Sequence, residues 1–393
     1  MYFIGQTRFS LYIPKSVAWN VSNFTEEEYI THLFSDERMA VRAKIFAEIS
    51  VPLMAKMKKD FNYHHIVSYS SILPAKWKAM LCELAKKYPF LYLCEVDSHK
   101  ENPIYSILKD KPNGPVAFFR LDDDDLLTVD YLSNLEKYNA PAYKNMAVSF
   151  GKGIIGLYEN NNYTDFRDVV QKYPSMGQAY IGYWQDNSLE LPPFYSHHDL
   201  DQNIPVIVDS INIMYLQTYH KQQDTNYRFS KDTQSNLMMA ELAKYPRSKT
   251  TTKLENYFPI LKENIEYFFE KKESYFKLKD KNIAQRNNVY PIEKGYKKDI
   301  FECEYTIELP EKFVSPKAIL ISFSFDKDVE VSSGLIFSSY KNIGWFKYLS
   351  TANGVASGML SFILKEPAKI TRIEITLWDE RFKSAFIKDI TIL

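Results

Sequence analysis

Four consecutive carboxylates, Asp122 to Asp125, follow an apolar run that begins at Pro115. The run contains β-branched and aromatic residues, which predicts a buried strand that ends in an acidic loop. Carboxylates this close repel one another in a low-dielectric setting, so a cation or Arg and Lys partners must neutralise them. Hard divalent cations suit this role, because Mg²⁺ and Mn²⁺ prefer oxygen ligands and keep positions open for water or phosphate. Spacing alone leaves two alternatives open, an acidic surface turn and the N-cap of the next helix.

The alternation of segments before the run predicts how it is positioned. Strands are predicted at residues 2–4, 65–69 and 90–94, and helices at residues 36–56, 74–87 and 102–109. This order predicts an α/β domain in which helices flank a mostly parallel sheet. Ligands bind beyond the carboxyl ends of the strands in such sheets, and the acidic run is expected at one of those ends.

Two glycine signals follow the run. Residues 146–150 and 154–158 flank Gly151-Lys152-Gly153, which predicts a β-hairpin and matches neither a Walker loop nor a dinucleotide fingerprint. Met176-Gly177 allows close backbone approach and could form the floor of an acceptor site, although a tight turn explains it equally well. His197 and His198 are further candidates for acceptor binding or for a metal, with a polar helix face as their alternative.

Composition limits the class of protein. A chain of 393 residues exceeds one ordinary core, so two domains, or one domain with an appendage, are expected. Lys and Arg total 49 and so do Asp and Glu, which leaves no basic field for nucleic acid. The three cysteines are scattered, and neither a signal-type start nor a long apolar run occurs. We expect a cytoplasmic protein that could still associate peripherally with the inner face of a membrane.

The composition changes after residue 250. Residues 251–298 begin with a helix-like tract to about Lys281 and predict a helical connector. Alternating apolar and polar residues from residue 299 to 393 predict an antiparallel β-sandwich of jelly-roll type. Its aromatic candidates for an exposed sugar-binding surface, as in carbohydrate-binding modules, are Tyr340, Trp345, Tyr348 and Trp378. Packing or homodimerisation is an equal alternative for this sandwich.

Five short segments between residues 1 and 240 form a pattern whose order and spacing are more specific than any one segment: Arg8–Ser10, Glu37–Met39 with Arg42 and Phe46, Asp122–Asp125, Ser175–Gly177 and Met214–His220. In these segments the chain resembles the bacterial putative rhamnosyltransferases, a family of GT-A-fold glycosyltransferases. The resemblance implies a GT-A-like domain over residues 1–250, a nucleotide-sugar donor linked to UDP, GDP or dTDP, and Mn²⁺ or Mg²⁺ at the acidic run. It also implies His220 as a third metal ligand or diphosphate contact, and inverting transfer to an acceptor hydroxyl.

Glycosyl transfer gives each residue of the acidic run a predicted role. The departing diphosphate must be neutralised, which a metal bridging its oxygens would do. We assign Asp122 to the ribose or to metal-bound water, Asp124 to direct metal ligation, and Asp125 to the metal or its second shell. Asp123 would point away.

The donor is expected to contact the ends of the first strands. Thr7, Arg8 and Phe9 end the first strand, and Tyr69 and Asp97, at the ends of the next two, are weaker candidates.

Inverting transfer also needs a general base near the acceptor oxygen. Asp209 is the first candidate, because it follows the apolar residues 204–208 and precedes His220. Asp186 is the second.

The sequence is compatible with two different functions. The first is a metal-dependent glycosyltransferase of bacterial surface polysaccharide, either capsule or lipopolysaccharide, which acts on a glycan or lipid-linked acceptor. The second is a non-catalytic glycan-binding scaffold with structural Ca²⁺. A nucleotidyl- or phosphotransferase is the nearest enzymatic rival, since it would use a similar acidic loop.

Overall fold

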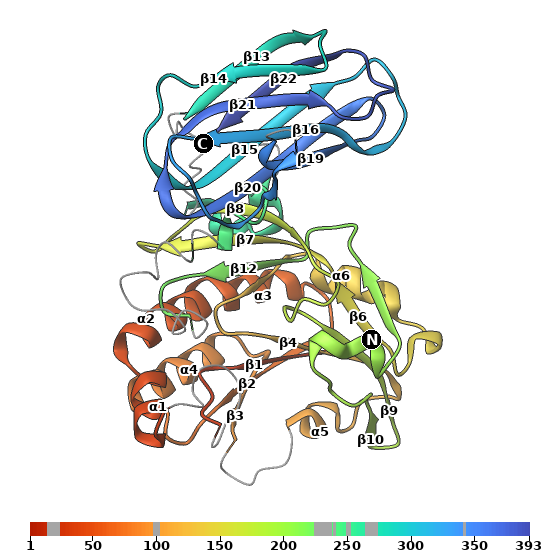
Figure 1. Cartoon of the computed structure of the whole chain (residues 1–393). Coiled ribbons are helices and arrows are strands. Elements are labelled where there is room, and N and C mark those ends of the chain that lie inside the picture. The colour runs from red at the N-terminus through yellow and green to blue at the C-terminus, as the bar shows by residue number, and fades with distance from the viewer. Residues whose placement is uncertain are drawn as a thin grey trace. The chain divides into compact units, whose positions relative to one another are not determined.

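The computed structural model describes residues 1–13, 24–96, 103–223, 238, 241–248, 253–263, 274–340 and 343–393. The chain divides into two compact units (Figure 1). The first comprises Met1–Gln234 and Ser248–Tyr267, and the second comprises Ser235–Arg247 and Phe268–Leu393.

The first unit is built on an eight-stranded central sheet in which most pairs are parallel. The strand order is β11-β6-β9-β4-β1-β2-β3, and β10 pairs with β9. The strands are β1 (Tyr2–Arg8), β2 (Tyr63–Tyr69), β3 (Leu91–Glu95), β4 (Gly114–Leu121), β6 (Ala147–Phe150), β9 (Ala179–Gln185), β10 (Ser188–Glu190) and β11 (Val206–Asp209). β1 runs parallel to β2 and β4, whereas β9 is antiparallel to β4 and β6. This arrangement confirms the predicted α/β class.

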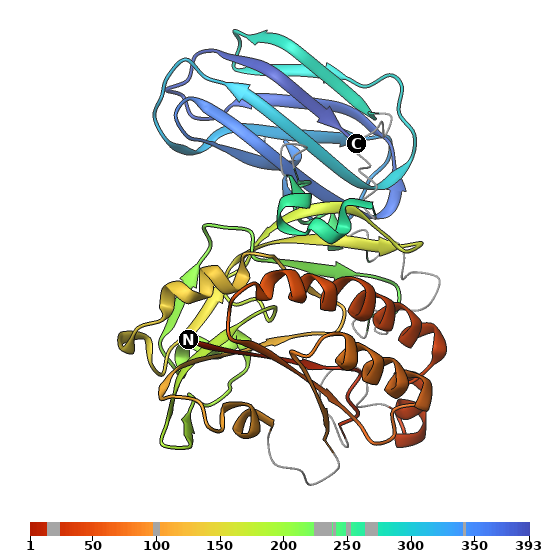
Figure 2. The same cartoon turned by 180° about the vertical axis from the view of Figure 1, so that it is seen from behind.

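Helices cover both faces of the central sheet. They are α1 (Glu26–Leu33), α2 (Asp36–Lys44), the π-helical η2 (Ile45–Ser50), α3 (Val51–Lys58), α4 (Ala75–Lys87), α5 (Pro103–Leu108), α6 (Tyr131–Leu135) and the 3-10 turns η3 (Glu136–Tyr138), η4 (Pro141–Tyr143) and η5 (His197–Gln202). In Figure 2 the red and orange helices α2 to α4 lie over one face. On the other face, Ile104 and Leu108 of α5 pack with Ile4 and Phe118 in one core cluster.

The described helices include none with both the length and the apolar character needed to cross a bilayer.

A smaller four-stranded sheet has the order β5-β12-β7-β8. Its strands are β5 (Leu126–Leu127), β7 (Lys152–Glu159), β8 (Asn162–Val170) and β12 (Tyr215–Tyr219), and the short helices α8 (Leu254–Tyr257) and η7 (Pro259–Glu263) pack on the same core.

The predicted hairpin around Gly151 is wrong, because β6 belongs to the central sheet and β7 to the smaller one. The chain changes sheets at Gly151, where an added Cβ would collide with Ser210 and with the carbonyl oxygen of Gln171. The hairpin is β7–β8 instead. Its two loop residues, Asn160 and Asn161, have positive φ of 50° and 66°, as a tight hairpin turn of type I′ requires.

The second unit is a sandwich of two five-stranded antiparallel sheets with the orders β13-β22-β15-β20-β17 and β14-β21-β16-β19-β18. The strands are β13 (Phe276–Ile283), β14 (Asn287–Pro291), β15 (Lys298–Glu308), β16 (Ser315–Phe325), β17 (Val331–Ser333), β18 (Ile336–Ser338), β19 (Gly344–Thr351), β20 (Val355–Ala368), β21 (Ile370–Leu377) and β22 (Ala385–Ile392). Phe301, Phe323 and Phe362 from both sheets share its core. From β13 to β18 the chain alternates between the sheets, which fits the predicted jelly-roll type.

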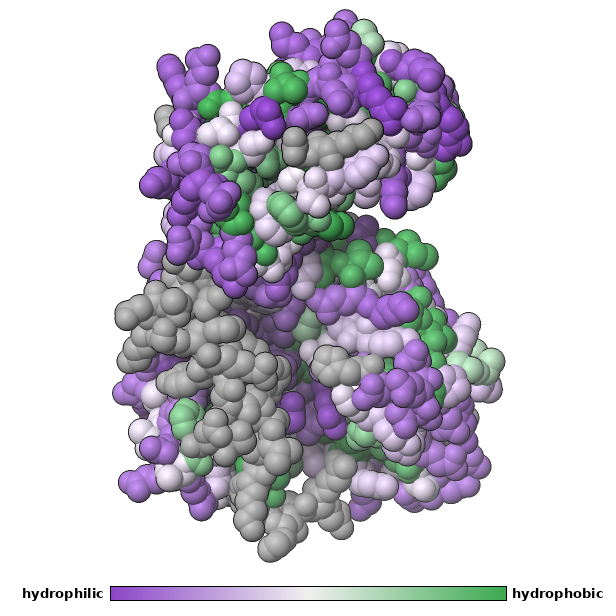
Figure 3. Space-filling view, in the orientation of Figure 1, coloured by the Kyte–Doolittle hydropathy of each residue, from purple (hydrophilic) through white to green (hydrophobic). Residues whose placement is uncertain are grey.

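The predicted helical connector over residues 251–298 agrees with the structure only at its start, where α8 and η7 form, and is wrong for residues 276–283 and 287–291. Residues 276–283 form strand β13, with Leu278 and Ile283 buried and Lys277, Lys279 and Lys281 outside. The strand period of two holds over residues 276–279 and does not extend to Ile283, which lies four residues after the exposed Lys279. The abundance of Glu and Lys nearby favoured a helix. Hydrophilic side chains accordingly cover much of the outer surface of this unit in Figure 3.

Candidate active site

The acidic run follows β4 at the carboxyl edge of the central sheet, as predicted. The four carboxylates differ in environment: half of the Asp122 side chain is exposed, whereas Asp123, Asp124 and Asp125 are buried. An acidic surface turn would expose all four. The three buried side chains therefore exclude that alternative for most of the run.

Asp123 is turned toward helix α2 and the end of β1. It accepts hydrogen bonds from the backbone N–H of Ser10 at 2.9 Å and from the Ser10 hydroxyl at 3.2 Å, and it pairs with Arg42. Arg38, one turn before Arg42, donates to Ser10 Oγ at 3.0 Å and to the Leu33 carbonyl at 2.9 Å. The two arginines lie on the same face of α2 because they are four residues apart.

Arg42 also reaches Asp124, with its Nη2 3.0 Å from Oδ2. Both Asp123 and Asp124 therefore share one buried guanidinium, which offsets part of the negative charge without a metal. Arg42 lies in one of the family segments, but its sequence context predicted no role for it. No local pattern predicts a pair between residues about 80 positions apart.

His220 contacts Asp124 from the end of β12, and its implied role as a metal ligand or diphosphate contact stays a prediction. Its Nε2 lies 3.1 Å from Asp124 Oδ2, and its Nδ1 accepts from the backbone N–H of Gln222 at 3.2 Å. A ring nitrogen that accepts a hydrogen bond carries no proton, so the proton of the neutral ring is on Nε2. His220 therefore donates that proton to Asp124.

Asp125 connects the acidic run to the smaller sheet. Its Oδ1 accepts from the backbone N–H of Thr218 at 2.9 Å, and its carbonyl accepts from Ser50 Oγ at 3.3 Å. Burial and the charge of Asp124 raise the pKa of Asp125 well above its ordinary value. This side chain is held by the protein itself and positions β12.

Asp122 is the member of the run that is open to a ligand. Its Oδ1 lies 3.9 Å from Arg8 Nη2, and each of these side chains is about half exposed. Surrounding protein atoms, followed by the charge of Asp124, raise the pKa of Asp122 to about 6, while Arg8 opposes this shift. Since water still reaches half of the side chain, the burial effect is weaker than for Asp125.

Among the donor-binding candidates on β1, only Arg8 offers its side chain. The side chains of Thr7 and Phe9, which were also predicted to bind the donor, are fully buried on the opposite face of the strand, so burial does not support that role for them. Thr7 Oγ1 bonds to Nε2 of His65 at 2.9 Å, and Phe9 packs on Phe46 with ring centroids 5.3 Å apart. Burial lowers the pKa of His65 to about 3, so this ring is neutral.

Two other donor candidates stay predictions. Tyr69, at the end of β2, is partly buried, and burial followed by the charge of Glu95 raises the pKa of its hydroxyl. Asp97 lies outside the described residues.

The two candidate bases do not join the acidic run. Asp209 ends β11 at the same edge, but β6 and β9 separate it from β4, which places the strands about 14 Å apart. Its carboxylate accepts from the Tyr138 hydroxyl at 2.9 Å and from the backbone N–H of Ile211 at 3.1 Å. Asp209 therefore stabilises the end of β11, and the structure gives no support to a role as base.

Asp186 lies at the opposite edge of the sheet, because β9 runs antiparallel to β4. Its backbone N–H donates to Asn113 at 3.0 Å, just before the first residue of β4. The full length of β4, about 25 Å, therefore separates it from Asp122. The prediction of Asp186 as a catalytic base at this site is wrong.

The predicted Met176-Gly177 turn lies against the end of β4. The Gly177 N–H donates to the Arg120 carbonyl at 2.9 Å, and its own carbonyl accepts from the Tyr131 hydroxyl. Gly177 has φ +66°, and an added Cβ would lie 2.7 Å from the Tyr131 ring. Met176 is buried. The tight turn is present, and a role in acceptor binding stays a prediction.

His197 is the first residue of η5 and is partly buried, whereas the side chain of His198 lies outside the described residues. Their predicted roles are untested.

The side chains at the run fit a divalent cation only in part. Among the described residues, no three or more His, Cys, Asp or Glu side chains are grouped as a ligand set for a metal. Asp122 is open, and Asp124 and His220 are adjacent, but Nε2 of His220 would have to release its proton first. Two carboxylates and an imidazole suit Mn²⁺ better than Mg²⁺.

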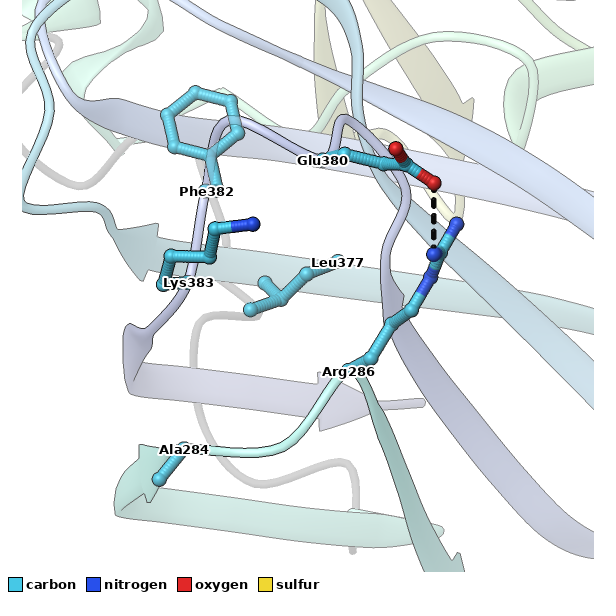
Figure 4. A pocket seen from close by; sticks show the side chains of 6 residues that line it. All are labelled: Ala284, Arg286, Leu377, Glu380, Phe382 and Lys383. Carbon is cyan, nitrogen blue, oxygen red and sulfur yellow. Dashed lines mark hydrogen bonds and ion pairs between the residues drawn. The ribbon is translucent and has the colours of Figure 1, made fainter.

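A separate hollow of about 480 Å³ lies in the second unit (Figure 4). Its lining residues are Ala284, Arg286, Leu377, Glu380, Phe382 and Lys383, and Arg286 pairs with Glu380 at 2.9 Å. The predicted sugar-binding aromatic residues do not line it. Tyr348 and Trp378 instead contact each other with ring centroids 5.4 Å apart, and Trp345 contacts Phe337 at 5.1 Å.

Comparison with solved structures finds similar chains of low identity. TarS 1–349 of S. aureus, solved in complex with UDP-GlcNAc, has 11% identity and a TM-score of 0.33, and the match covers 62% of this chain and 66% of that one. The inositol-1-phosphate CTP transferase from T. maritima has 9% identity and a TM-score of 0.24, with 62% and 97% covered. HddC from Yersinia pseudotuberculosis has 10% identity and a TM-score of 0.21, with 56% and 90% covered. The match thus spans slightly less than two thirds of TarS 1–349.

Comparison with curated proteins gives no match. The sequence model of the family described as putative rhamnosyl transferase matches residues 2–232. This is more than half of the 393 residues and includes β1, the acidic run and His220. The chain therefore belongs to the putative rhamnosyl transferase family, a family of glycosyltransferases.

Proposed function

We propose that this protein is a glycosyltransferase that moves a sugar from a nucleotide-sugar donor to an acceptor hydroxyl. The main support is the arrangement of Asp122, Arg8 and the Asp124–His220 pair at the carboxyl edge of the central sheet. Membership in the family supports the same reaction class. The donor would lie across the ends of β1 and β4, where ligands bind in open α/β sheets.

Arg8 would bind the donor diphosphate. Its guanidinium is about half exposed and lies 3.9 Å from Asp122, so an incoming phosphate can reach it. Guanidinium groups match phosphate oxygens with paired hydrogen bonds. Asp122 would accept a hydrogen bond from the ribose or from water bound to a metal.

A divalent cation, Mn²⁺ or Mg²⁺, is part of the proposal. The ion would be held by Asp122, Asp124 and His220. Asp125, which accepts a hydrogen bond from the backbone N–H of Thr218, would ligate the ion or fix the position of its ligands. When bound, the ion would neutralise charge on the leaving diphosphate. Arg42 keeps the carboxylates of Asp123 and Asp124 in place through its two ion pairs.

The proposal also covers the stereochemistry of transfer, the acceptor and the second unit. Transfer would invert the anomeric centre, with a base other than Asp186, and Asp209 would reach the acceptor only if the site rearranged. The acceptor would be a glycan or a lipid-linked glycan of bacterial capsule or lipopolysaccharide, met by peripheral contact with a membrane. The second unit would hold acceptor or form a dimer.

A thermal-shift titration tests the central claim. Wild-type protein is titrated with UDP, GDP and dTDP, each with and without Mn²⁺, beside the variants Asp122→Asn and Asp186→Asn. We expect at least one nucleoside diphosphate to raise the melting temperature of wild type and Asp186→Asn in the presence of Mn²⁺. The shift should be lost in Asp122→Asn. A protein that binds none of the three nucleotides, with or without metal, would contradict the proposal.

A further inference from the structure

Beside the acidic run, two polar side chains lie on one face of the central sheet: Arg120 on β4, and Gln178 directly before β9. The antiparallel register pairs Phe118 with Tyr180 and Phe119 with Ala179. Continued by one residue, it sets Arg120 opposite Gln178, on the face that also carries Phe118 and Tyr180. Side chains directly opposite each other on neighbouring strands have Cβ atoms about 5 Å apart. Arg120 and Gln178 are therefore neighbours. Arg120 lies two residues before Asp122, and Gln178 directly follows Gly177.

Arg120 forms no salt bridge within 4.0 Å among the residues that the structure describes, although the charge of Asp122 acts on it. Its guanidinium lies 4.7 Å from the centroid of the Phe194 ring, and its Nε is buried without an acceptor. Phe194 also contacts Phe118 and Tyr180, with ring centroids 5.0 and 4.8 Å away, so the ring that faces the guanidinium is itself fixed.

Gln178 supplies the second donor without an acceptor, after Nε of Arg120. The residue is only 6% exposed, and its Oε1 accepts from the Tyr180 hydroxyl at 3.3 Å. Its Nε2 is buried and has no acceptor in the described structure. A buried donor without an acceptor is rare in folded proteins and destabilising, so such a group often marks a place that a ligand completes.

We propose that Arg120 and Gln178 form a subsite for an anionic oxygen group, a phosphate or a carboxylate, on a substrate bound at this edge. The subsite rests on the proposed function, because that function places a substrate there. Arg120 and the Gln178 amide nitrogen offer donors alone, which acceptor-only oxygens satisfy. Asp122 partly offsets the charges of Arg8 and Arg120, and a bound anion would offset them further.

The position in the sheet separates this subsite from the nucleotide end of the donor. The strand order β9-β4-β1-β2-β3 places Arg120 and Gln178 on the β9 side of the acidic run. The nucleoside is expected over β1 to β3, where the other predicted donor contacts, Tyr69 and Asp97, follow the strands. The anionic group therefore belongs to the transferred sugar or to the acceptor, and the donor diphosphate is the alternative source.

Direct titration with small anions tests the subsite without turnover. Inorganic phosphate, glucose 1-phosphate and glucuronate are titrated into the full chain by NMR or calorimetry, with glucose as the neutral control. The variants are Arg120→Met, which keeps the apolar contact with Phe194, and Gln178→Leu, which keeps the volume. Arg372→Met on β21 is the matched control, because it removes an exposed arginine from the second unit.

We expect at least one of the three anions to bind wild type and Arg372→Met equally, and to bind Arg120→Met about tenfold or more weakly. Gln178→Leu should weaken binding severalfold; because it removes the unsatisfied donor and also the acceptor of the Tyr180 hydroxyl, its melting temperature is measured to confirm that it folds. Failure of all three anions to bind wild type overturns the subsite. Equal affinity of a folded Arg120→Met variant also overturns it.

A second arm identifies the source of the anion and separates this inference from the proposed function. UDP, GDP and dTDP with Mn²⁺ are titrated into the same variants. Unchanged nucleotide affinity in Arg120→Met supports a group on the sugar or acceptor, whereas a parallel loss supports the donor diphosphate. If no nucleotide binds wild type but anion binding still depends on Arg120, the proposed function fails and the subsite stands.

Discussion

Replacing Arg42 with Met should strongly destabilise the first unit. Arg42 is buried and pairs with both Asp123 and Asp124, so its removal leaves two buried carboxylates without their cation. Removing one partner of a buried ion pair costs about 3–5 kcal/mol. Asp123 keeps its two bonds from Ser10, and Asp124 keeps the one from His220. We therefore expect the lower end, about 3 kcal/mol.

Urea denaturation and thermal melting of the full chain measure this loss. A loss of 1 kcal/mol lowers the melting temperature of a unit of this size by about 2–4 °C, so the melting temperature of the first unit should fall by about 6–12 °C. The double variant Arg42→Met/Asp123→Asn removes one of the stranded charges, so it should recover about 1–2 kcal/mol relative to Arg42→Met. Lys76→Met, which breaks an exposed pair with Asp36, is the control and should change stability by about 1 kcal/mol or less.

Two results would refute this reasoning. One is an Arg42→Met variant within about 1 kcal/mol of wild type. The other is a double variant no more stable than Arg42→Met alone. Either result would mean that the carboxylates are neutralised by something other than this arginine.

Three further predictions concern residues around the site. If Asp122 binds ligand as a carboxylate, nucleotide affinity in Mn²⁺ should fall as pH drops through about 6, the pKa of Asp122, and titrations from pH 5 to 8 should show no such fall in Asp122→Asn. The pKa of His65 is about 3 in the folded protein and about 6.5 when unfolded, so between these pH values the unfolded chain binds one more proton. The contribution of neutral His65 to the free energy of unfolding should therefore be complete above pH 6.5 and decline by up to about 1.4 kcal/mol per pH unit toward pH 3. Urea denaturation across this range should give a smaller slope for His65→Gln. Gly177→Ala should lower the free energy of unfolding by about 1–3 kcal/mol, because φ is +66° and the new Cβ would press on Tyr131, whereas Gly114→Ala, at ordinary φ with 3.4 Å to Tyr2, should change it less.

The sequence predicted those features that depend on local pattern. The apolar run ending in four Asp residues predicted a buried strand with an acidic end, because period and composition are properties of neighbouring residues. The long helix from Asp36 was predicted for the same reason, and residues 36–58 form α2, η2 and α3 in succession. The alternating strands of the second unit also follow a local pattern. These features needed no knowledge of long-range contacts.

Other features depend on pairings across the chain. The role of Arg42 requires α2 to lie beside the end of β4, and nothing in residues 36–44 specifies that contact. The burial of Thr7 and Phe9 depends on which face of β1 meets the helices, since alternation alone does not say which side is the interior. The hairpin error had a similar cause: a glycine between two apolar runs can turn the chain within one sheet or carry it to another.

The direction of β9 decides which residues could meet at this site. Parallel strands bring their carboxyl ends to one edge, so a residue at the end of a predicted strand is expected beside the others. β9 is antiparallel to β4, and its first residues lie at that edge instead of its last. The reversal places Asp186, at the end of β9, about one strand length from Asp122. The same reversal sets Gln178, before the start of β9, next to Arg120. A search for site residues at strand ends therefore selects the wrong end of this strand, and the two unused donors lie at the end that such a search omits.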